Sequence, residues 1–149
     1  MKWIKRLLGI GENEAVSNAD VFIRAYNYEE QEIRNAGSYK GKHYTEYIEY
    51  IKQLKRKRKH EKAINLLLEI VNAVEREARM AEKLKGVDWF IAPGYYEDLA
   101  IIYRKEKRYD EEVEILKRYC NQTKAPRARV TKLEQRLTKA KALRDKQKI

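Results

Sequence analysis

The residue types that most often carry chemistry are sparse in this chain of 149 residues. Its two histidines, His43 and His60, stand in no metal-ligand spacing, and no HExxH, paired CxxC, phosphate-loop or nucleophile-elbow motif is present. The acidic stretches EREARMAE and YDEEVE are interpreted as solvated helix faces. We therefore expect a protein that is not an enzyme, with no catalytic residue, no metal site and no cofactor.

Cys120 is the single cysteine, which excludes an internal disulfide and a cysteine-based metal site. Basic neighbours near a helix end could activate its thiol, but packing is the favoured interpretation of a lone cysteine. The N-terminal MKWIKRLLGI lacks the apolar core of a signal peptide, and no segment approaches the roughly 18 apolar residues that span a bilayer. A chain without disulfides suits a reducing compartment, so we expect a cytoplasmic location.

The composition predicts that the chain folds into helices. Only 6 Gly and 2 Pro interrupt the chain, and no run of alternating apolar and polar residues persists, which favours an all-α fold. A charged fraction of 38% and a mean hydropathy of -0.84 would suit disorder, but 43% apolar residues, with eleven tyrosines, are enough to build a core. The length fits one folded domain.

Two stretches of the chain share one pattern. GYYEDLAIIYRKEKRYDEEVEILKRY covers residues 94–119, and YIEYIKQLKRKRKHEKAINLLLEI covers residues 47–70, an offset of 49 without gaps. In each stretch apolar residues recur three or four apart, a basic turn follows, and the same spacing resumes. Each stretch therefore predicts an antiparallel helical hairpin.

These hairpins resemble tetratricopeptide repeats, whose 34-residue unit is a helix-turn-helix with a pattern of small and aromatic residues. The resemblance rests on Tyr96, Leu99, Ala100, Tyr103, Tyr109, Asp110 and Leu116 in the later copy, and on Tyr47, Tyr50, His60, Ala63 and Leu67 in the earlier one. It implies a short right-handed stack of hairpins. Ala63 stands at the small position of the family, whereas its counterpart Glu112 departs from it and should loosen the packing there.

The offset of 49 predicts a long central helix, because it exceeds one repeat by about 15 residues. The excess lies between Glu69 and Tyr95, and the helical pattern continues to about Gly86. In the apolar connection VDWFIAPG that follows, core packing is favoured for Trp89 over a ligand-binding role. GSYKGKHY, residues 37–44 before the first hairpin, is interpreted as a loop.

Two hairpins need caps, because each one buries only part of its apolar surface. Val21, Phe22, Tyr26 and Ile33 are expected to form an N-terminal helical cap, and a helix opened by Pro126 should cap the other end with Val130, Leu133, Leu137 and Ala140. We therefore divide the chain into an amphipathic segment (1–12), a tetratricopeptide-like helical domain (13–123) and a basic capping helix with its tail (124–149).

The first helix of each hairpin carries tyrosines, and in proteins of the resembled family this helix lines the concave groove. Tyrosine offers apolar area and a polar tip with little rotamer entropy to lose, which suits recognition. For any single ring, filling the space between helices is the favoured alternative. For the groove as a whole we predict that a protein or peptide partner binds at Tyr47, Tyr50, Tyr96 and Tyr103.

The formal charge of +11 is concentrated in the basic turns and the C-terminal tail. Residues 55–62 carry a net +5 and residues 124–149 a net +8. Both turns should lie along one edge of the stack and form a basic surface of Lys55, Arg56, Lys57, Arg58, Lys59, Arg104, Lys105, Lys107 and Arg108. Our leading hypothesis is an adaptor protein, and this edge would select its acidic partners. The alternative is a nucleic-acid-binding accessory protein that uses the first turn and the tail.

The segment of residues 1–10 offers a further contact. As a helix it would place Trp3, Ile4, Leu7 and Leu8 on one side and its cations on the other, an arrangement suited to an anionic membrane surface. Docking on the protein's own cap or on another subunit is the favoured alternative. The identity of the partner and the oligomeric state are left open by the sequence.

Overall fold

The structure, a computed structural model, describes residues 2–124 and 131–149. Most of this part is helical, so the all-α prediction is confirmed for it. The helices are α1 (Lys2–Leu7), α2 (Asn18–Ala36), α3 (Ile48–Arg56), α4 (His60–Lys85), α5 (Gly94–Lys105), α6 (Tyr109–Cys120) and α7 (Thr131–Gln147), with a 3-10 turn η1 (Tyr44–Tyr47) and two short strands, β1 (Ser38–Tyr39) and β2 (Lys42–His43). Among the described helices, none combines the length and apolarity that crossing a membrane requires.

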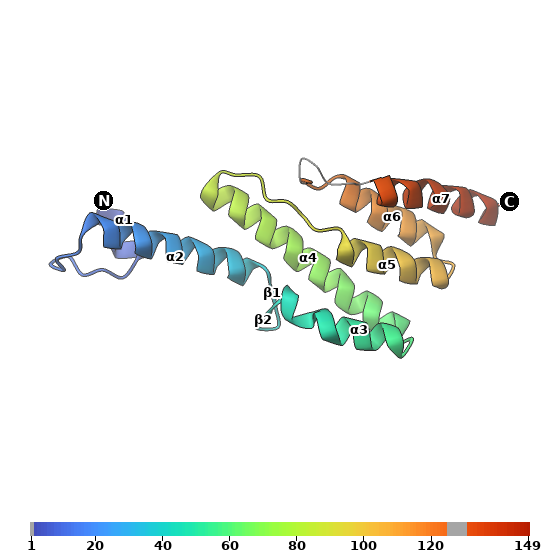
Figure 1. Cartoon of the computed structure of the whole chain (residues 1–149), viewed down its shortest axis with the longest axis horizontal. Helices are drawn as coiled ribbons and strands as arrows, with labels where there is room; N and C mark the ends of the chain where they lie inside the picture. The colour runs from blue at the N-terminus through green and yellow to red at the C-terminus, as the bar shows by residue number, and fades with distance from the viewer. Residues whose placement is uncertain (1, 125–130) are drawn as a thin grey trace.

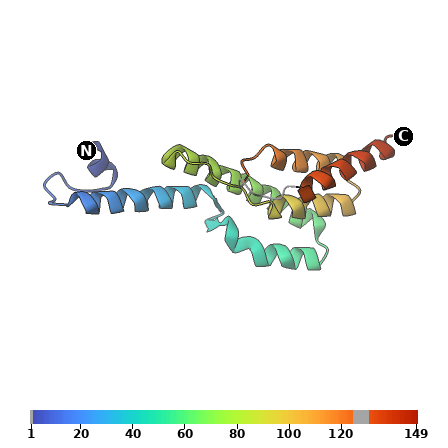
Figure 2. The same cartoon turned by 45° about the horizontal axis from the view of Figure 1, so that its top comes forward.

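Helices α3 to α7 lie side by side and alternate in direction, whereas α2 leads away from them toward the N-terminus (Figure 1). The N-terminus and the C-terminus therefore lie at opposite ends of an elongated molecule, and a second view shows the same arrangement (Figure 2). The core lies where α3, α4, α5, α6 and α7 meet, and its centre consists of fully buried Leu67, Ile70, Leu99 and Leu116.

The turns of the two hairpins have the same hydrogen bonds at an offset of 49 residues. In the first turn the N–H groups of Lys57, Arg58 and Lys59 donate, in that order, to the carbonyls of Gln53, Lys55 and Leu54 at 3.0–3.1 Å. In the second turn the N–H groups of Glu106, Lys107 and Arg108 donate, in the same order, to the carbonyls of Ile102, Arg104 and Tyr103 at 2.8–3.0 Å. Both turns hold one residue in the left-handed region, Arg58 with φ 52° and Lys107 with φ 55°. The repeat offset read from the sequence is confirmed for these turns.

Helix α4 is the long central helix that the sequence predicts. Its 26 residues give a length of about 39 Å. It ends where the pattern indicates, because Gly86 adopts φ 63° and its N–H donates to the carbonyl of Glu82, a left-handed cap that glycine accepts without strain.

A buried carboxylate on α4 holds the second hairpin. Arg118 of α6 donates to both oxygens of Glu75, at 2.8 Å from Nε and 2.7 Å from Nη2, and the hydroxyl of Tyr96 on α5 donates to Oε1 at 2.8 Å. Arg118 also donates to Asn72 at 2.8 Å. Because a buried charge must be paired, these bonds fix α5 and α6 together against α4.

Glu112 does not leave the second hairpin loosely packed. Its side chain is 0% exposed, and the guanidinium of Arg104 on α5 approaches both carboxylate oxygens, at 3.1 Å to Oε2 and 2.7 Å to Oε1. Arg136 of α7 lies 3.6 Å from Oε1. Where the first copy has the small residue Ala63, the second copy thus has a buried charge that needs cations from both neighbouring helices. The pairing of Glu112 with Arg136 joins α7 to the hairpin.

The predicted caps are confirmed in part. In α7, Leu133 and Ala140 are buried, while Pro126 and Val130 lie outside the described residues. In α2, Val21 and Ile33 are buried, but Phe22 is 74% and Tyr26 is 58% exposed, so the prediction that these two contribute to the apolar face of the cap was wrong.

Phe22 and Tyr26 are exposed because α2 is longer than the part of it that packs beside α4. Lys85, the last residue of α4, pairs with Glu30 and lies 4.8 Å from the centroid of the Tyr26 ring. The part of α2 that precedes Tyr26 therefore extends past the end of α4. No helix of the row covers Phe22 and Tyr26 there, whereas Val21 in the same part of α2 is buried.

We predict that Glu112→Ala destabilises the fold by about 2 to 3 kcal/mol, because it leaves Arg104 and Arg136 unpaired. The expected loss is at the low end for a buried pair, since both arginines are partly exposed. Urea denaturation measures it. The matched control is Glu114→Ala, which removes a 71% exposed carboxylate 3.5 Å from Lys117 and should change stability by less than about 0.5 kcal/mol. Equal losses in both variants would contradict this account.

Candidate functional site

The four tyrosines of the predicted groove divide into two pairs. Tyr50 is 51% exposed and Tyr47 is half-buried, whereas Tyr96 is 0% exposed and Tyr103 is buried in the core. The prediction that Tyr96 and Tyr103 line a partner-binding groove was wrong. Helix α5 packs between α4 and α6, so its tyrosines fill the core, while α3 stands at the outer edge (Figure 1).

A groove of about 480 Å³ lies at Tyr47 and Tyr50 on this outer edge. Its wall combines the β1–β2 turn, α3 and the first half of α4. It is lined by Tyr39, Lys40, Tyr47, Tyr50, Leu54, Lys62, Asn65, Leu66 and Glu69. Three tyrosines, two leucines and two lysines against one carboxylate make it an aromatic groove with a net positive charge; we call it the tyrosine groove.

The β1–β2 turn completes the tyrosine groove. Lys40 and Gly41 both adopt positive φ, 48° and 79°, which makes a two-residue hairpin where the sequence indicated only a loop. The hydroxyl of Tyr47 donates to the carbonyl of Tyr39 at 2.6 Å, and the two ring centroids lie 5.8 Å apart. Sequence reasoning missed Tyr39, Lys40 and Lys62; the dipeptide Lys40-Gly41 was the available signal for a tight turn.

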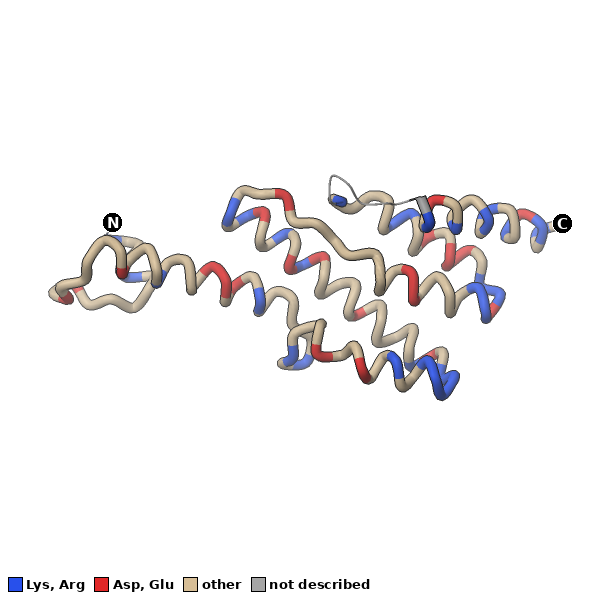
Figure 3. The backbone as a smooth tube through the Cα atoms, viewed as in Figure 1, with Lys and Arg blue, Asp and Glu red and all other residues tan. Residues whose placement is uncertain are grey.

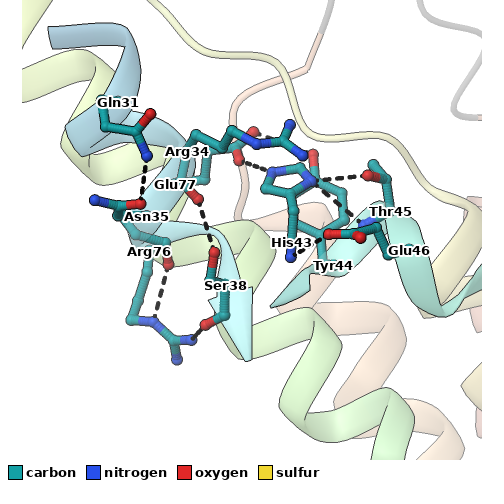
Figure 4. Close-up of polar contacts among 11 residues, drawn as sticks. Gln31, Arg34, Asn35, Ser38, His43, Tyr44, Thr45, Glu46, Arg76 and Glu77 are labelled. Carbon is teal, nitrogen blue, oxygen red and sulfur yellow. Dashed lines mark hydrogen bonds and ion pairs between the residues drawn. The ribbon is translucent and has the colours of Figure 1, made fainter. Parts of the chain in front are cut away.

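A polar cluster behind the groove attaches the β1–β2 turn to α4 (Figure 4). Nε2 of the buried His43 pairs with Oε2 of Glu77, and the Tyr44 hydroxyl donates to Oε1 of Glu77 at 3.1 Å. Arg76 donates to the carbonyls of Ala36 at 3.2 Å and of Ser38 at 3.0 Å.

A side chain at position 37 would disturb this cluster. A Cβ on Gly37 would collide with the carboxylate of Glu77 and lie 2.9 Å from Nε2 of His43. Glycine at this position therefore leaves room for the pair of His43 and Glu77 that attaches the β1–β2 turn to α4.

A second cavity, of about 490 Å³, lies between α2 and α4. It is lined by Asn27, Glu30, Gln31, Ile33, Arg34, His43, Glu77 and Trp89. Its acidic groups are already engaged, because Glu77 binds His43 and Tyr44 and Glu30 pairs with Lys85. Trp89 is partly buried against the core and also lines this cavity, so its predicted packing role is confirmed.

The basic turns and the end of α7 meet at one end of the molecule (Figure 3). Glu106 of the second turn pairs with His60, and Arg108 lies 2.7 Å from Glu61 across the two hairpins. Gln147 near the end of α7 donates to the carbonyl of Lys107 at 3.3 Å. We call residues 55–62, 104–108 and 139–149 the basic end.

The basic end holds all of the net positive charge of the protein. Its three segments contain fifteen Lys or Arg against three acidic residues, a net charge of +12, which exceeds the +11 of the whole chain. The remainder of the protein is therefore almost neutral, and the electrostatic field is directed to one side.

The predicted basic surface is only partly available to a partner. Lys55 pairs with Asp98, Arg56 with Glu49, Arg104 with Glu112, and Arg108 with Glu61 and Glu111. Of the nine cations of the predicted basic surface, all of them in the described part of the chain, five are exposed and have no acidic side chain within ion-pair distance. They are Lys57, Arg58, Lys59, Lys105 and Lys107.

The described residues contain no group of three His, Cys, Asp or Glu side chains that could hold a metal ion. Cys120 ends α6 and is partly exposed. Comparison of the chain with protein-family models, with curated proteins and with solved structures finds no match. The tyrosine groove and the basic end are therefore interpreted from their own geometry and charge.

We expect Tyr96→Ala to lower the free energy of unfolding by about 3 to 5 kcal/mol, because it removes a fully buried ring and its bond to Glu75. Tyr50→Ala, its counterpart on the outer edge, should change stability by less than about 0.5 kcal/mol. Urea denaturation followed by circular dichroism compares the two. A large loss in Tyr50→Ala would place that ring in the core and remove it from the groove.

Buried tyrosines should make the protein sensitive to alkali. Burial, followed by the hydrogen bond to Glu75, raises the pKa of Tyr96, and burial also raises the pKa of Tyr44, Tyr95, Tyr103 and Tyr119. Above the ordinary tyrosine pKa of about 10 the unfolded chain loses these protons while the folded protein keeps them, so stability falls as pH rises.

In Tyr96→Phe we expect the decline of unfolding free energy above about pH 10 to be shallower by about 1.4 kcal/mol per pH unit. Urea denaturation at a series of pH values between 9 and about 11 measures both slopes. Identical slopes in the variant and the wild type would show that the Tyr96 hydroxyl ionises equally well in the folded protein, against its burial.

Proposed function

We propose that the protein is a non-enzymatic, tetratricopeptide-like adaptor that binds an acidic segment of a partner protein in the tyrosine groove. The observation that supports this function is the exposed Tyr50 beside Tyr47 and Tyr39, in a groove that also contains Lys40 and Lys62. Tyrosine is enriched at protein interfaces, because its ring offers apolar area and its hydroxyl can still bind a polar group.

The chemistry of the tyrosine groove fits a peptide with both apolar and acidic side chains. The tyrosine rings and Leu66 provide apolar area at a small entropic cost, and aromatic anchors of this type commonly contribute about 2 kcal/mol or more to an interface. Lys40 and Lys62 would neutralise carboxylates of the partner, and Lys62 itself belongs to the basic end. Both features favour an acidic segment.

The position of the groove also supports the resemblance to a helical-repeat adaptor. Helix α4 packs on the second hairpin through α5 and also packs on α2, and α7 covers the other end of the row. A further repeat of a longer array would pack on the outer side of the first hairpin, and here the part of that side at α3 and the first half of α4 carries the tyrosine groove.

The test is affinity capture of tagged variants from native lysate after nuclease treatment, read by mass spectrometry. We expect the wild type to retain a discrete partner and Tyr50→Ala to lose it, with at least a tenfold reduction in recovery. Lys62→Glu should weaken retention as well, because it repels acidic side chains.

Tyr26→Ala is the matched control, since Tyr26 is also an exposed tyrosine but lies on α2, away from the tyrosine groove. It should retain the partner. A partner that binds all three variants equally, or that is lost only with Tyr26→Ala, would place the interface elsewhere and contradict the proposal.

A further inference from the structure

We infer that the basic end is a second binding surface, one that takes the phosphate backbone of a nucleic acid, with Arg58 and Lys107 as its central cations. This inference goes beyond the proposed adaptor function and does not depend on it, because its central cations lie outside the tyrosine groove and Lys62 is the one residue that belongs to both surfaces as they are defined above. Three observations carry it: the concentration of charge, the availability of the cations, and the backbone conformation at the two turn apices.

The charge is concentrated by the fold and not only by the sequence. Segments that are far apart in the chain converge because Glu61 contacts Arg108, Glu106 contacts His60, and Lys148 lies 3.5 Å from Asp110. These contacts hold the two turns and the end of α7 together and still leave a net +12 over the three segments. Such a field attracts polyanions and accelerates their encounter.

The cations at the two apices are available. Lys57, Arg58, Lys59, Lys105 and Lys107 are exposed, and in the described part of the chain no carboxylate lies within ion-pair distance of them. The cations that do have partners, such as Arg104 and Arg108, organise the turns. The surface is thus divided between residues that shape it and residues that face solvent.

The backbone conformation gives an independent argument. Arg58 and Lys107 occupy equivalent left-handed positions, with φ 52° and 55°. At such a position a side chain is strained, and glycine or asparagine is the favoured residue. A cation stands at both apices in place of the less strained residue. Strained residues of this kind are characteristic of functional sites.

The lack of apolar side chains favours a nucleic acid over an acidic protein. A stable protein interface has an apolar core, whereas binding to a phosphate backbone is polar and electrostatic. Among the described residues of the basic end, the terminal Ile149 is the only exposed large apolar side chain. The tyrosine groove has the opposite character, with several apolar groups and few cations.

The experiment measures fluorescence anisotropy of labelled duplex DNA and of single-stranded RNA, each with the full chain, at several salt concentrations. We expect binding whose logarithm falls linearly with the logarithm of salt concentration. The double variant Arg58→Gly/Lys107→Gly should bind on the order of tenfold more weakly at physiological salt, and its salt slope should be smaller by about 2.

The same double variant should melt at an unchanged or higher temperature, because glycine relieves the left-handed strain. If Arg58 and Lys107 served folding, the double variant would melt at a lower temperature than the wild type. If the glycine pair does melt lower, Arg58→Asn/Lys107→Asn, which tolerates the left-handed region, keeps the test decisive: it should fold and still bind weakly.

Lys40→Gly is the matched control. Lys40 is also a lysine at a left-handed position, with φ 48°, but it lies on the β1–β2 turn at the tyrosine groove. This variant and Tyr50→Ala should bind nucleic acid as the wild type does, which separates failure of this inference from failure of the adaptor proposal. Wild-type binding by the apex variants, an equal loss in Lys40→Gly, or equal affinity for polyglutamate would each overturn the inference.

Discussion

The burial of two carboxylates between helices is the constraint on which the arrangement of this protein depends. Glu75 requires Arg118 and Tyr96, which brings α6 and α5 against α4, and Glu112 requires Arg104 and Arg136, which brings α7 against the second hairpin. Apolar packing alone would allow neighbouring helices to slide, whereas a paired buried charge accepts few positions. With the hairpins held in this order and direction, both basic turns lie at the same end of the molecule.

The same constraint separates two surfaces of different chemistry. The second hairpin is enclosed by α4 and α7, so its tyrosines become core, while the outer face of the first hairpin stays open and forms the tyrosine groove with the β1–β2 turn. Cations gather at the turns, where side chains can reach solvent. One repeated hairpin therefore yields an aromatic surface on its outer side and a cationic surface at its end, because the two copies have different neighbours.

Local features of the fold follow from the sequence, and relations between distant segments do not. Apolar spacing and glycine placement predict both hairpins, the length of α4 and its end at Gly86. Periodicity identifies an apolar face but not whether another helix covers it. For this reason Tyr96 and Phe22 were both misplaced, one being core and the other exposed. The pairing of Arg136 with Glu112 spans too many residues to be read from spacing, and the groove needed the unrecognised turn at Lys40 and Gly41.

The central claim is that partner proteins bind the outer face of the first hairpin. Hydrogen–deuterium exchange of the full chain, alone and in complex with its captured, nuclease-treated partner, tests this most directly. Our account predicts slower exchange in peptides covering residues 39–69, with little change in α2 and α7. Protection confined to α2 or α7, with residues 39–69 exchanging as in the free protein, would contradict it.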